Sequence, residues 1–213
     1  MTRLPVLGML LIIPTVLTAQ EFGVAAHVGT LGIGADVGVA VHPRVTARVG
    51  GNFFPVNPSI TVSDIKYTAD FPSPQFTGMV DVFLVGGLRL SGGLRISGDD
   101  AGATGEITGS VDIGNATYTA AEVGTLTAVI ETNTAAPYIG IGFGNVARPG
   151  PRFFLDAGVA FQGRPAVTFS SDGTLASDPL FQAELVREAE AAEDDIELFR
   201  FYPVLSLGVA FGF

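Results

Sequence analysis

Six charged residues stand inside apolar, alternating segments and are the residues best placed to do electrostatic work: Asp36, Arg48, Asp81, Arg89, Arg95 and Asp156. Around each of them, the residues two positions away are mostly small or polar, while bulky apolar residues occupy the alternate positions. Because side chains alternate across a strand, all six are expected on a small-residue face that points inward. A buried charge needs a partner, so we expect these arginines and aspartates to form an ion-pair network that plugs a narrow interior.

The two histidines are the remaining candidates for acid–base chemistry. His42 precedes Pro43 in an expected turn, and His27 lies on the small-residue face of the first strand. A catalytic pair requires a base within about 3 Å of its nucleophile, and no spacing in this chain indicates one. We therefore expect no catalytic residues, no cofactor and no enzymatic activity.

Carboxylates gather near the C-terminus, with Arg187 among them: Glu184, Glu188, Glu190, Glu193, Asp194, Asp195 and Glu197. We expect them to form the solvated face of a helix and to hold no resident metal. Binding of a divalent cation is the alternative, because calcium and magnesium prefer oxygen ligands. The net charge of −10 argues against a nucleic acid as partner.

The composition indicates which elements position these residues. The chain has 213 residues, of which 47% are hydrophobic and 15% charged, whereas soluble domains carry about 25% charged residues. No internal segment approaches the roughly 18–20 consecutive apolar residues of a transmembrane helix. A closed β-barrel is the other structure that satisfies every backbone group in lipid, so a membrane barrel is favoured. A very hydrophobic secreted β-sandwich is the alternative.

The first 19 residues are typical of a secretory signal peptide. Arg3 precedes an apolar stretch from Leu4 to Leu17, and cleavage is expected after Ala19. A retained membrane anchor is the alternative. The chain has no cysteine, so neither a lipoprotein anchor nor a disulfide framework is possible. We expect a mature barrel over residues 20–213, with a helical insertion at about 178–199.

The alternation predicts strands of a length suited to a tilted crossing of the bilayer. Merging the first two alternating segments gives eight strands: 22–41, 44–54, 76–85, 88–97, 123–131, 136–144, 152–162 and 201–213. Splitting 22–29 from 31–41 and admitting 166–171 gives ten, which is the alternative. The proline-dotted and polar segments 55–75 and 98–122 are expected to be long loops.

The helix at 178–199 is expected to begin with Asp178 as its N-cap and Pro179 at its first position. An apolar stripe recurs at helical spacing: Phe181, Leu185, Ala189, Ala192, Ile196 and Phe199. We expect this stripe to fold over the outer mouth of the barrel as a cap, with the carboxylates facing solvent.

The final strand carries bulky apolar residues at every second position and ends on an aromatic residue: Leu205, Leu207, Val209, Phe211 and Phe213. With the signal peptide and the alternating strands, this ending makes the chain resemble small Gram-negative outer-membrane β-barrel proteins of the OmpA/OmpW-like group. The resemblance implies an all-β, antiparallel, up-and-down transmembrane barrel in the cell outer membrane. It also implies that the last strand is recognised by the barrel assembly machinery. Expected partners are outer-membrane lipid, lipopolysaccharide and periplasmic chaperones.

Two functions are open at this point. The first is a non-enzymatic, porin-like protein of the cell envelope, either structural or passing small or hydrophobic solutes through a narrow or plugged lumen. The second is a surface interaction protein that binds a partner, or cation-bridged lipopolysaccharide, through its loops and acidic helix.

Overall fold

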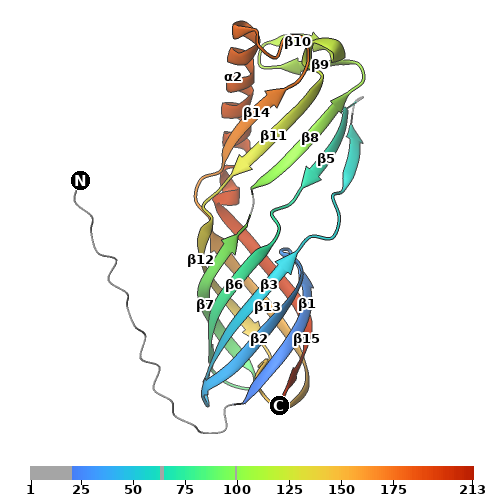
Figure 1. The fold of residues 1–213 in the computed structure, drawn as a ribbon. Helices are drawn as coiled ribbons and strands as arrows, with labels where there is room; N and C mark the ends of the chain where they lie inside the picture. The colour runs from blue at the N-terminus through green and yellow to red at the C-terminus, as the bar shows by residue number, and fades with distance from the viewer. Residues whose placement is uncertain (1–20, 63–64, 99) are drawn as a thin grey trace, which may run out of the picture.

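A closed antiparallel β-barrel forms one half of the molecule in the computed structural model, which describes residues 21–62, 65–98 and 100–213 (Figure 1). The eight barrel strands are β1 (Phe22–Gly29), β2 (Gly32–His42), β3 (Val45–Phe53), β6 (Gln75–Phe83), β7 (Leu88–Ser97), β12 (Ala135–Phe143), β13 (Gly150–Phe161) and β15 (Phe201–Gly212). Their order around the barrel is β1-β15-β13-β12-β7-β6-β3-β2, closed by the pairing of β1 with β2. The expected fold class and the count of eight are confirmed. The expected signal peptide lies outside the described residues.

Alternation along each barrel strand separates the two faces as the sequence predicts. In β2 the inward residues are buried or half-buried, while the outward residues Ile33 and Val37 are exposed. The other barrel strands continue this apolar outer belt. A belt of exposed aliphatic and aromatic side chains is stable against lipid and would cause aggregation in water.

Three details of the strand assignment were wrong. Residues 22–41 are not one bent strand, because the chain turns back at Thr30–Leu31 and β1 pairs with β2. Gly32 has a φ of +95°, which a residue with a side chain rarely adopts, and it closes this turn. Residues 123–131 were expected in the barrel and 166–171 in its ten-strand alternative, but residues 125–131 and 166–171 belong to a second sheet, and Val123 ends a short helix. A half-buried strand has the same period against lipid as against a protein core, so alternation alone does not separate the two.

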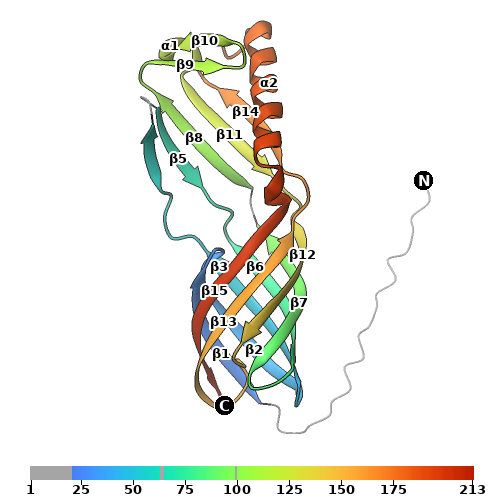
Figure 2. The same cartoon turned by 180° about the vertical axis from the view of Figure 1, so that it is seen from behind.

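The second sheet is built from three long excursions, residues 54–74, 98–134 and 162–200, which all leave the same end of the barrel (Figure 2). Its strands are β4 (Ser59–Val62), β5 (Ile65–Asp70), β8 (Ala101–Ile107), β11 (Thr125–Glu131) and β14 (Ala166–Ser171), in the order β14-β11-β8-β5-β4. Much of the segments 55–75 and 98–122 is therefore strand, where loops were expected. We call this end of the barrel the domain end. The opposite end, where β1 begins and β15 ends, is the terminal end.

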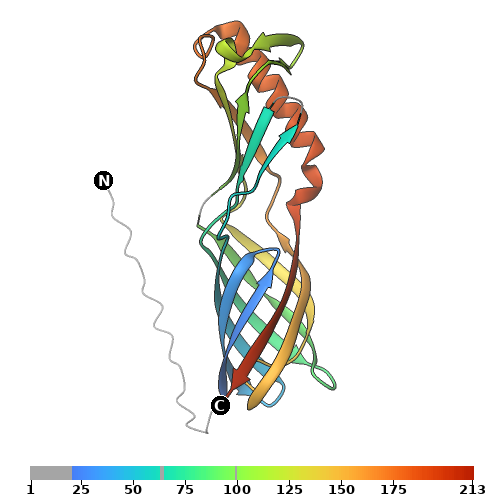
Figure 3. The ribbon, with the colours of Figure 1, turned by 90° about the vertical axis from the view of Figure 1, so that its right-hand side faces the viewer.

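A second layer packs on this sheet and completes the extramembrane domain (Figure 3). It contains β9 (Ser110–Ile113), β10 (Ala116–Thr119), the short helix α1 (Ala120–Val123) and helix α2 (Pro179–Asp195), and the 3₁₀ helix η1 (Glu197–Arg200) leads from α2 to the barrel strand β15. Ile113, Val123, Phe181 and Leu185 form its fully buried centre. The domain therefore has a hydrophobic core of its own, separate from the barrel interior.

Helix α2 begins as the sequence predicts and packs elsewhere than predicted. The Asp178 carboxylate accepts hydrogen bonds from the backbone N–H groups of Leu180 and Phe181, at 2.9 and 3.0 Å. The buried part of the apolar stripe, Phe181, Leu185 and Ala189, lies on the helix that packs on β14 and β9 rather than over the barrel mouth, and Phe199 is exposed, so the expected cap over the barrel was wrong. The physical reason is that the excursions supply an apolar sheet for the helix to cover, which the sequence analysis had taken as loops.

The acidic face of α2 is only partly free. Glu184 accepts from the backbone N–H of Asn115, and Glu188 accepts from that of Gly114, both at 3.0 Å. Glu193 accepts from the backbone N–H of Val167 at 2.8 Å. These carboxylates tie the helix to the turn between β9 and β10 and to β14, whereas all of them were expected to face solvent. None of the helices in the described residues has the length and apolarity needed to cross a membrane.

Candidate functional site: the filled barrel lumen

Arg48 of β3 stands at the centre of the charged network in the barrel interior. Its Nε donates to Asp81 Oδ2 at 2.7 Å, and its Nη1 donates to Asp36 Oδ2 at 3.0 Å and to Asp156 Oδ2 at 3.1 Å. These carboxylates come from β6, β2 and β13, so one guanidinium spans the lumen. Its charge-assisted hydrogen bonds tie strands that are not all neighbours in the sheet.

Arg89 of β7 supplies the second cation of the same network. Its Nη2 donates to Asp156 Oδ1 at 2.7 Å, and its Nε lies 3.3 Å from Asp81 Oδ2. Ser91, two residues further along β7, donates its hydroxyl to Asp81 Oδ1 at 2.6 Å. Arg89 is 0% exposed, so these contacts are what offsets the cost of removing its charge from water. Three carboxylates and two guanidiniums give the network a formal charge of −1.

Arg95 lies apart from this network, although it was expected to share it. Its Nη1 donates to Gln75 Oε1 at 2.7 Å, and its Nη2 donates to Gln162 Oε1 at 2.6 Å. The guanidinium also lies over the ring of Tyr202, 5.3 Å from the centroid. Amide oxygens and a ring face thus take the place of a carboxylate. Gln162 lies an even number of positions after Asp156 in its expected strand, so the sequence indicated that it points inward with Arg95. Nothing in the sequence indicated the same for Gln75.

A small polar cavity borders the network beside β1. His27 Nε2 lies 3.6 Å from Asp36 Oδ2, and the His27 ring meets Phe154 edge-on at 5.6 Å between centroids. Several buried polar atoms here form no hydrogen bond with described residues: both ring nitrogens of His27, both side-chain amide atoms of Asn52 and the hydroxyl of Tyr138. These residues line a cavity of about 30 Å³. That volume suits about two water molecules, at roughly 10–15 Å³ each.

The terminal end of the lumen is filled by a turn. In the connection between β12 and β13, Val146 and Ala147 are almost fully buried. Val146 packs with Ala25 and Phe154 on the inner barrel wall, in a cluster that Ala210 completes. The neighbouring Asn145 Oδ1 accepts hydrogen bonds from Thr46 Oγ1 at 3.2 Å and from the backbone N–H of Ala147 at 2.9 Å. The sequence analysis missed this turn because its residues carry no signal beyond that of a hairpin connection.

The lumen is therefore filled in successive layers. The turn at 144–149 closes the terminal end, and the five-residue charge network occupies the middle. An apolar cluster that contains Leu31, Met79 and Val204 packs next to Tyr138, and the Arg95 layer follows toward the domain end. The cavity of about 30 Å³ beside His27, which borders the charged layer, is far too small for solute passage.

The residues of the expected assembly signal all point outward from β15. Leu205, Leu207, Val209, Phe211 and Phe213 are exposed on the lipid-facing side. Strand β15 pairs with both β1 and β13, so it joins the two ends of the barrel sequence. The backbone N–H of Phe213 donates to Phe22 O at 2.8 Å, and the two rings stack at 5.0 Å. Recognition of this strand by the assembly machinery stays a prediction.

A closed eight-stranded barrel with an apolar outer belt, a filled lumen and long excursions at one end defines the class: this is the fold of the small Gram-negative outer-membrane β-barrels. Among solved structures, the chain is similar to CarO of Acinetobacter baumannii, with a TM-score of 0.59 and 20% identity over 90% of this chain and 97% of that one. It is also similar to CarO2 of the same organism, with a TM-score of 0.63 and 21% identity over 92% of this chain and 100% of that one. At this level of identity the likeness extends to the fold. No family model and no curated protein matches the sequence.

Proposed function

We propose that this chain is a non-enzymatic integral protein of the outer membrane, exported through a cleaved signal peptide, whose sealed barrel anchors an interaction domain at the cell surface. The filling of the lumen carries this proposal. The Arg48 network, the Val146 turn and the Arg95 layer each block the axis of the barrel. A barrel blocked in this way is suited to anchoring rather than to transport.

The arrangement of connections supports an orientation with the domain outside the cell. Outer-membrane barrels have short periplasmic turns and longer extracellular loops. Here the terminal end has the short connections 43–44, 84–87 and 144–149, while the three long excursions leave the domain end. Both described chain ends of the barrel then lie on the periplasmic side.

The charge of the excursions supports a cationic or cation-bridged partner. The excursions 54–74, 98–134 and 162–200 contain 2, 6 and 9 carboxylate residues, 17 in all, against 4 lysines and arginines. Lipopolysaccharide carries phosphates, and divalent cations can bridge them to carboxylates because both supply hard oxygen ligands. On α2, Glu190, Asp194 and Asp195 are exposed and form no hydrogen bond or ion pair with described residues, so they are free to take part.

Flux through the purified protein tests the sealed barrel. In liposome-swelling and single-channel measurements we expect no uptake of small solutes and no stable conductance. Large, stable, porin-sized conductance would contradict the proposal and favour solute passage through the lumen as the function.

The absence of cysteine from the chain allows a clean test of orientation. Glu190→Cys on α2 is expected to react with a membrane-impermeant maleimide on intact cells after removal of the outer polysaccharide. Val85→Cys, in the 84–87 turn, is expected to react only after the outer membrane is permeabilised. The reverse result would place the domain in the periplasm.

Cation-dependent binding tests the partner class. The protein in nanodiscs should bind lipopolysaccharide-coated surfaces in millimolar calcium or magnesium, and the binding should fall on addition of EDTA. The variant with Glu190→Gln, Asp194→Asn and Asp195→Asn should lose this dependence. Binding that is insensitive both to EDTA and to the triple substitution would refute a cation bridge.

A further inference from the structure

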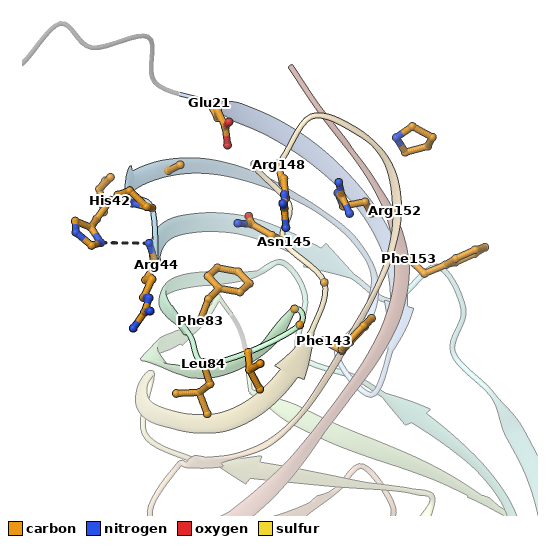
Figure 4. Close-up of a pocket in the computed structure, with 18 residues that line it drawn as sticks. Glu21, His42, Arg44, Phe83, Leu84, Phe143, Asn145, Arg148, Arg152 and Phe153 are labelled. Carbon is orange, nitrogen blue, oxygen red and sulfur yellow. Dashed lines mark hydrogen bonds between the residues drawn. The ribbon is translucent and has the colours of Figure 1, made fainter.

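The terminal end of the barrel holds an arginine-lined basin that the proposed surface function does not use (Figure 4). The basin has a volume of about 980 Å³ and opens at the end of the barrel opposite the extramembrane domain. Arg44 reaches it from the turn between β2 and β3, Arg148 from the turn between β12 and β13, and Arg152 from the start of β13. Arg148 and Arg152 flank the same connection, whereas the turn that carries Arg44 is separated from it by other strands around the barrel, so the arginines come from two parts of the rim.

These three arginines differ from every other described cation in what they contact. Lys66, Arg164, Arg187 and Arg200 of the domain each lie within 3.4 Å of a glutamate carboxylate oxygen. Inside the lumen, Arg48 and Arg89 contact aspartates, and Arg95 contacts two glutamines. In the part of the chain that the structure describes, Arg44, Arg148 and Arg152 contact no carboxylate. Arg152 donates only to the backbone carbonyl of Pro149, at 3.3 Å.

The surroundings of the arginines favour an anion. Glu21 is the one carboxylate side chain among the lining residues, and His42 adds a further nitrogen donor to the three guanidiniums. The basin borders the turn that carries the buried Val146, which fills this end of the lumen. Phosphate oxygens match the planar guanidinium fork better than other common anions do, because two parallel N–H donors can engage two oxygens.

Part of the rim of the basin is apolar. Val85 and Phe153 are each 76% exposed, and Leu84 and Phe143 also line the rim. Cationic groups bordered by exposed apolar side chains at a membrane-facing end are suited to a lipid headgroup, whose phosphate meets the charge while its acyl chains lie beside the barrel.

We propose that this basin is a binding site for a phosphate oxyanion, with the headgroup of an anionic phospholipid as the source that the apolar rim favours. A soluble phosphate ester shares the same chemistry, and the experiment separates the two sources. The site does not depend on the fate of the extramembrane domain, since its residues belong to the barrel rim alone.

The test uses the full mature protein in mixed micelles of phosphatidylglycerol and phosphatidylcholine, read by native mass spectrometry. We expect bound phosphatidylglycerol to exceed phosphatidylcholine several-fold, and this preference to weaken at high salt. The variant with Arg44→Gln, Arg148→Gln and Arg152→Gln should bind phosphatidylglycerol at least about tenfold more weakly, since it lacks the charge-assisted hydrogen bonds to the phosphate.

The matched control is the variant with Arg164→Gln, Arg187→Gln and Arg200→Gln, which changes the net charge equally at the domain end. It should bind phosphatidylglycerol like the unmodified protein. Heat-modifiable migration on gels verifies that both variants are folded barrels.

A second arm measures binding of soluble glycerol phosphate by titration calorimetry. Arginine-dependent lipid binding without glycerol phosphate binding assigns the headgroup as the ligand. Arginine-dependent binding of glycerol phosphate with equal affinity assigns a soluble phosphate ester. Equal loss of lipid binding in the two triple variants, or no loss in either, overturns the proposal.

Discussion

Replacing Arg48 by methionine tests whether the lumen network holds the barrel together. Among the described residues, Arg48 is the one guanidinium that contacts Asp36, at 3.0 Å, whereas Asp81 and Asp156 also contact Arg89. Methionine fills much of the same volume but leaves the Asp36 carboxylate buried without its cation, and the formal charge of the network falls from −1 to −2. Removing one partner of a buried ion pair costs about 3–5 kcal/mol.

That cost is large compared with the stability of a small barrel. Small domains unfold with about 5–15 kcal/mol, so Arg48→Met should remove about a fifth or more of the total free energy of unfolding. With a urea dependence of about 2 kcal/mol per molar, the unfolding midpoint should fall by roughly 1.5–2.5 M. The assay is urea titration of the protein in lipid vesicles, followed by the gel mobility of unboiled samples.

A second substitution separates electrostatics from packing. Adding Asp36→Asn to Arg48→Met removes the stranded charge and should recover at least about 1 kcal/mol, which is a coupling that independent sites do not show. Arg164→Met is the matched surface control. Arg164 pairs with Glu197 at 3.2 Å but its side chain is 71% exposed, so its loss should cost less than about 1 kcal/mol. If Arg48→Met were as mild as Arg164→Met, or if Asp36→Asn gave no recovery, the network would not be a stabilising element.

Three further outcomes are expected. Phe213→Asp should prevent insertion, because it places a charge at the end of the lipid-facing closing strand, and heat-modifiable protein in outer-membrane fractions should disappear; normal amounts would exclude an assembly role. Phe181 is 1% exposed, so Phe181→Ala should destabilise the packing of α2 by about 3–5 kcal/mol and make α2 sensitive to protease while the barrel stays folded. Leu180 is 79% exposed, so Leu180→Ala should have little effect. The backbone N–H and hydroxyl of Thr119 donate to the Glu122 carboxylate and lower its pKa. The stabilisation of the α1 cap by these hydrogen bonds is therefore fully present above the ordinary glutamate pKa and is lost as the pH falls through the lowered pKa. Hydrogen exchange of α1, corrected for intrinsic rates, should show this acid loosening, and Glu122→Gln should remove the pH dependence.

The inward set of charges could be predicted from the sequence because strand geometry is local. Asp36, Arg48, Asp81, Arg89 and Asp156 share the small-residue face of their strands, and the structure places all five in one buried network. The same parity placed Arg95 inward, but its partners could not be inferred. Gln75 is a neutral amide at the end of its strand, and its residue type does not indicate whether it faces solvent or the lumen.

The location of strands in the barrel or outside it could not be predicted. The strands expected at 123–131 and 166–171 alternate as the barrel strands do, yet residues 125–131 and 166–171 form β11 and β14 of the extramembrane sheet. The difference lies in what covers their apolar face. Phe169 and Leu126 meet the second layer with Phe181, whereas Leu207 meets lipid. Both coverings bury apolar surface, so both produce the same alternation.

By itself, the sequence determined the class of protein: the alternation, the scarcity of charge and the aromatic C-terminal strand predict a membrane barrel, because local side-chain parity and composition require no knowledge of distant contacts. Only the tertiary structure decided which carboxylates Arg48 joins, that the Val146 turn enters the lumen, and that α2 packs on a sheet instead of the barrel mouth. Each of these depends on which segments meet across the closed barrel or between the excursions. Barrel closure and strand stagger determine which segments come into contact. Closure and stagger are properties of the whole chain that no single segment encodes.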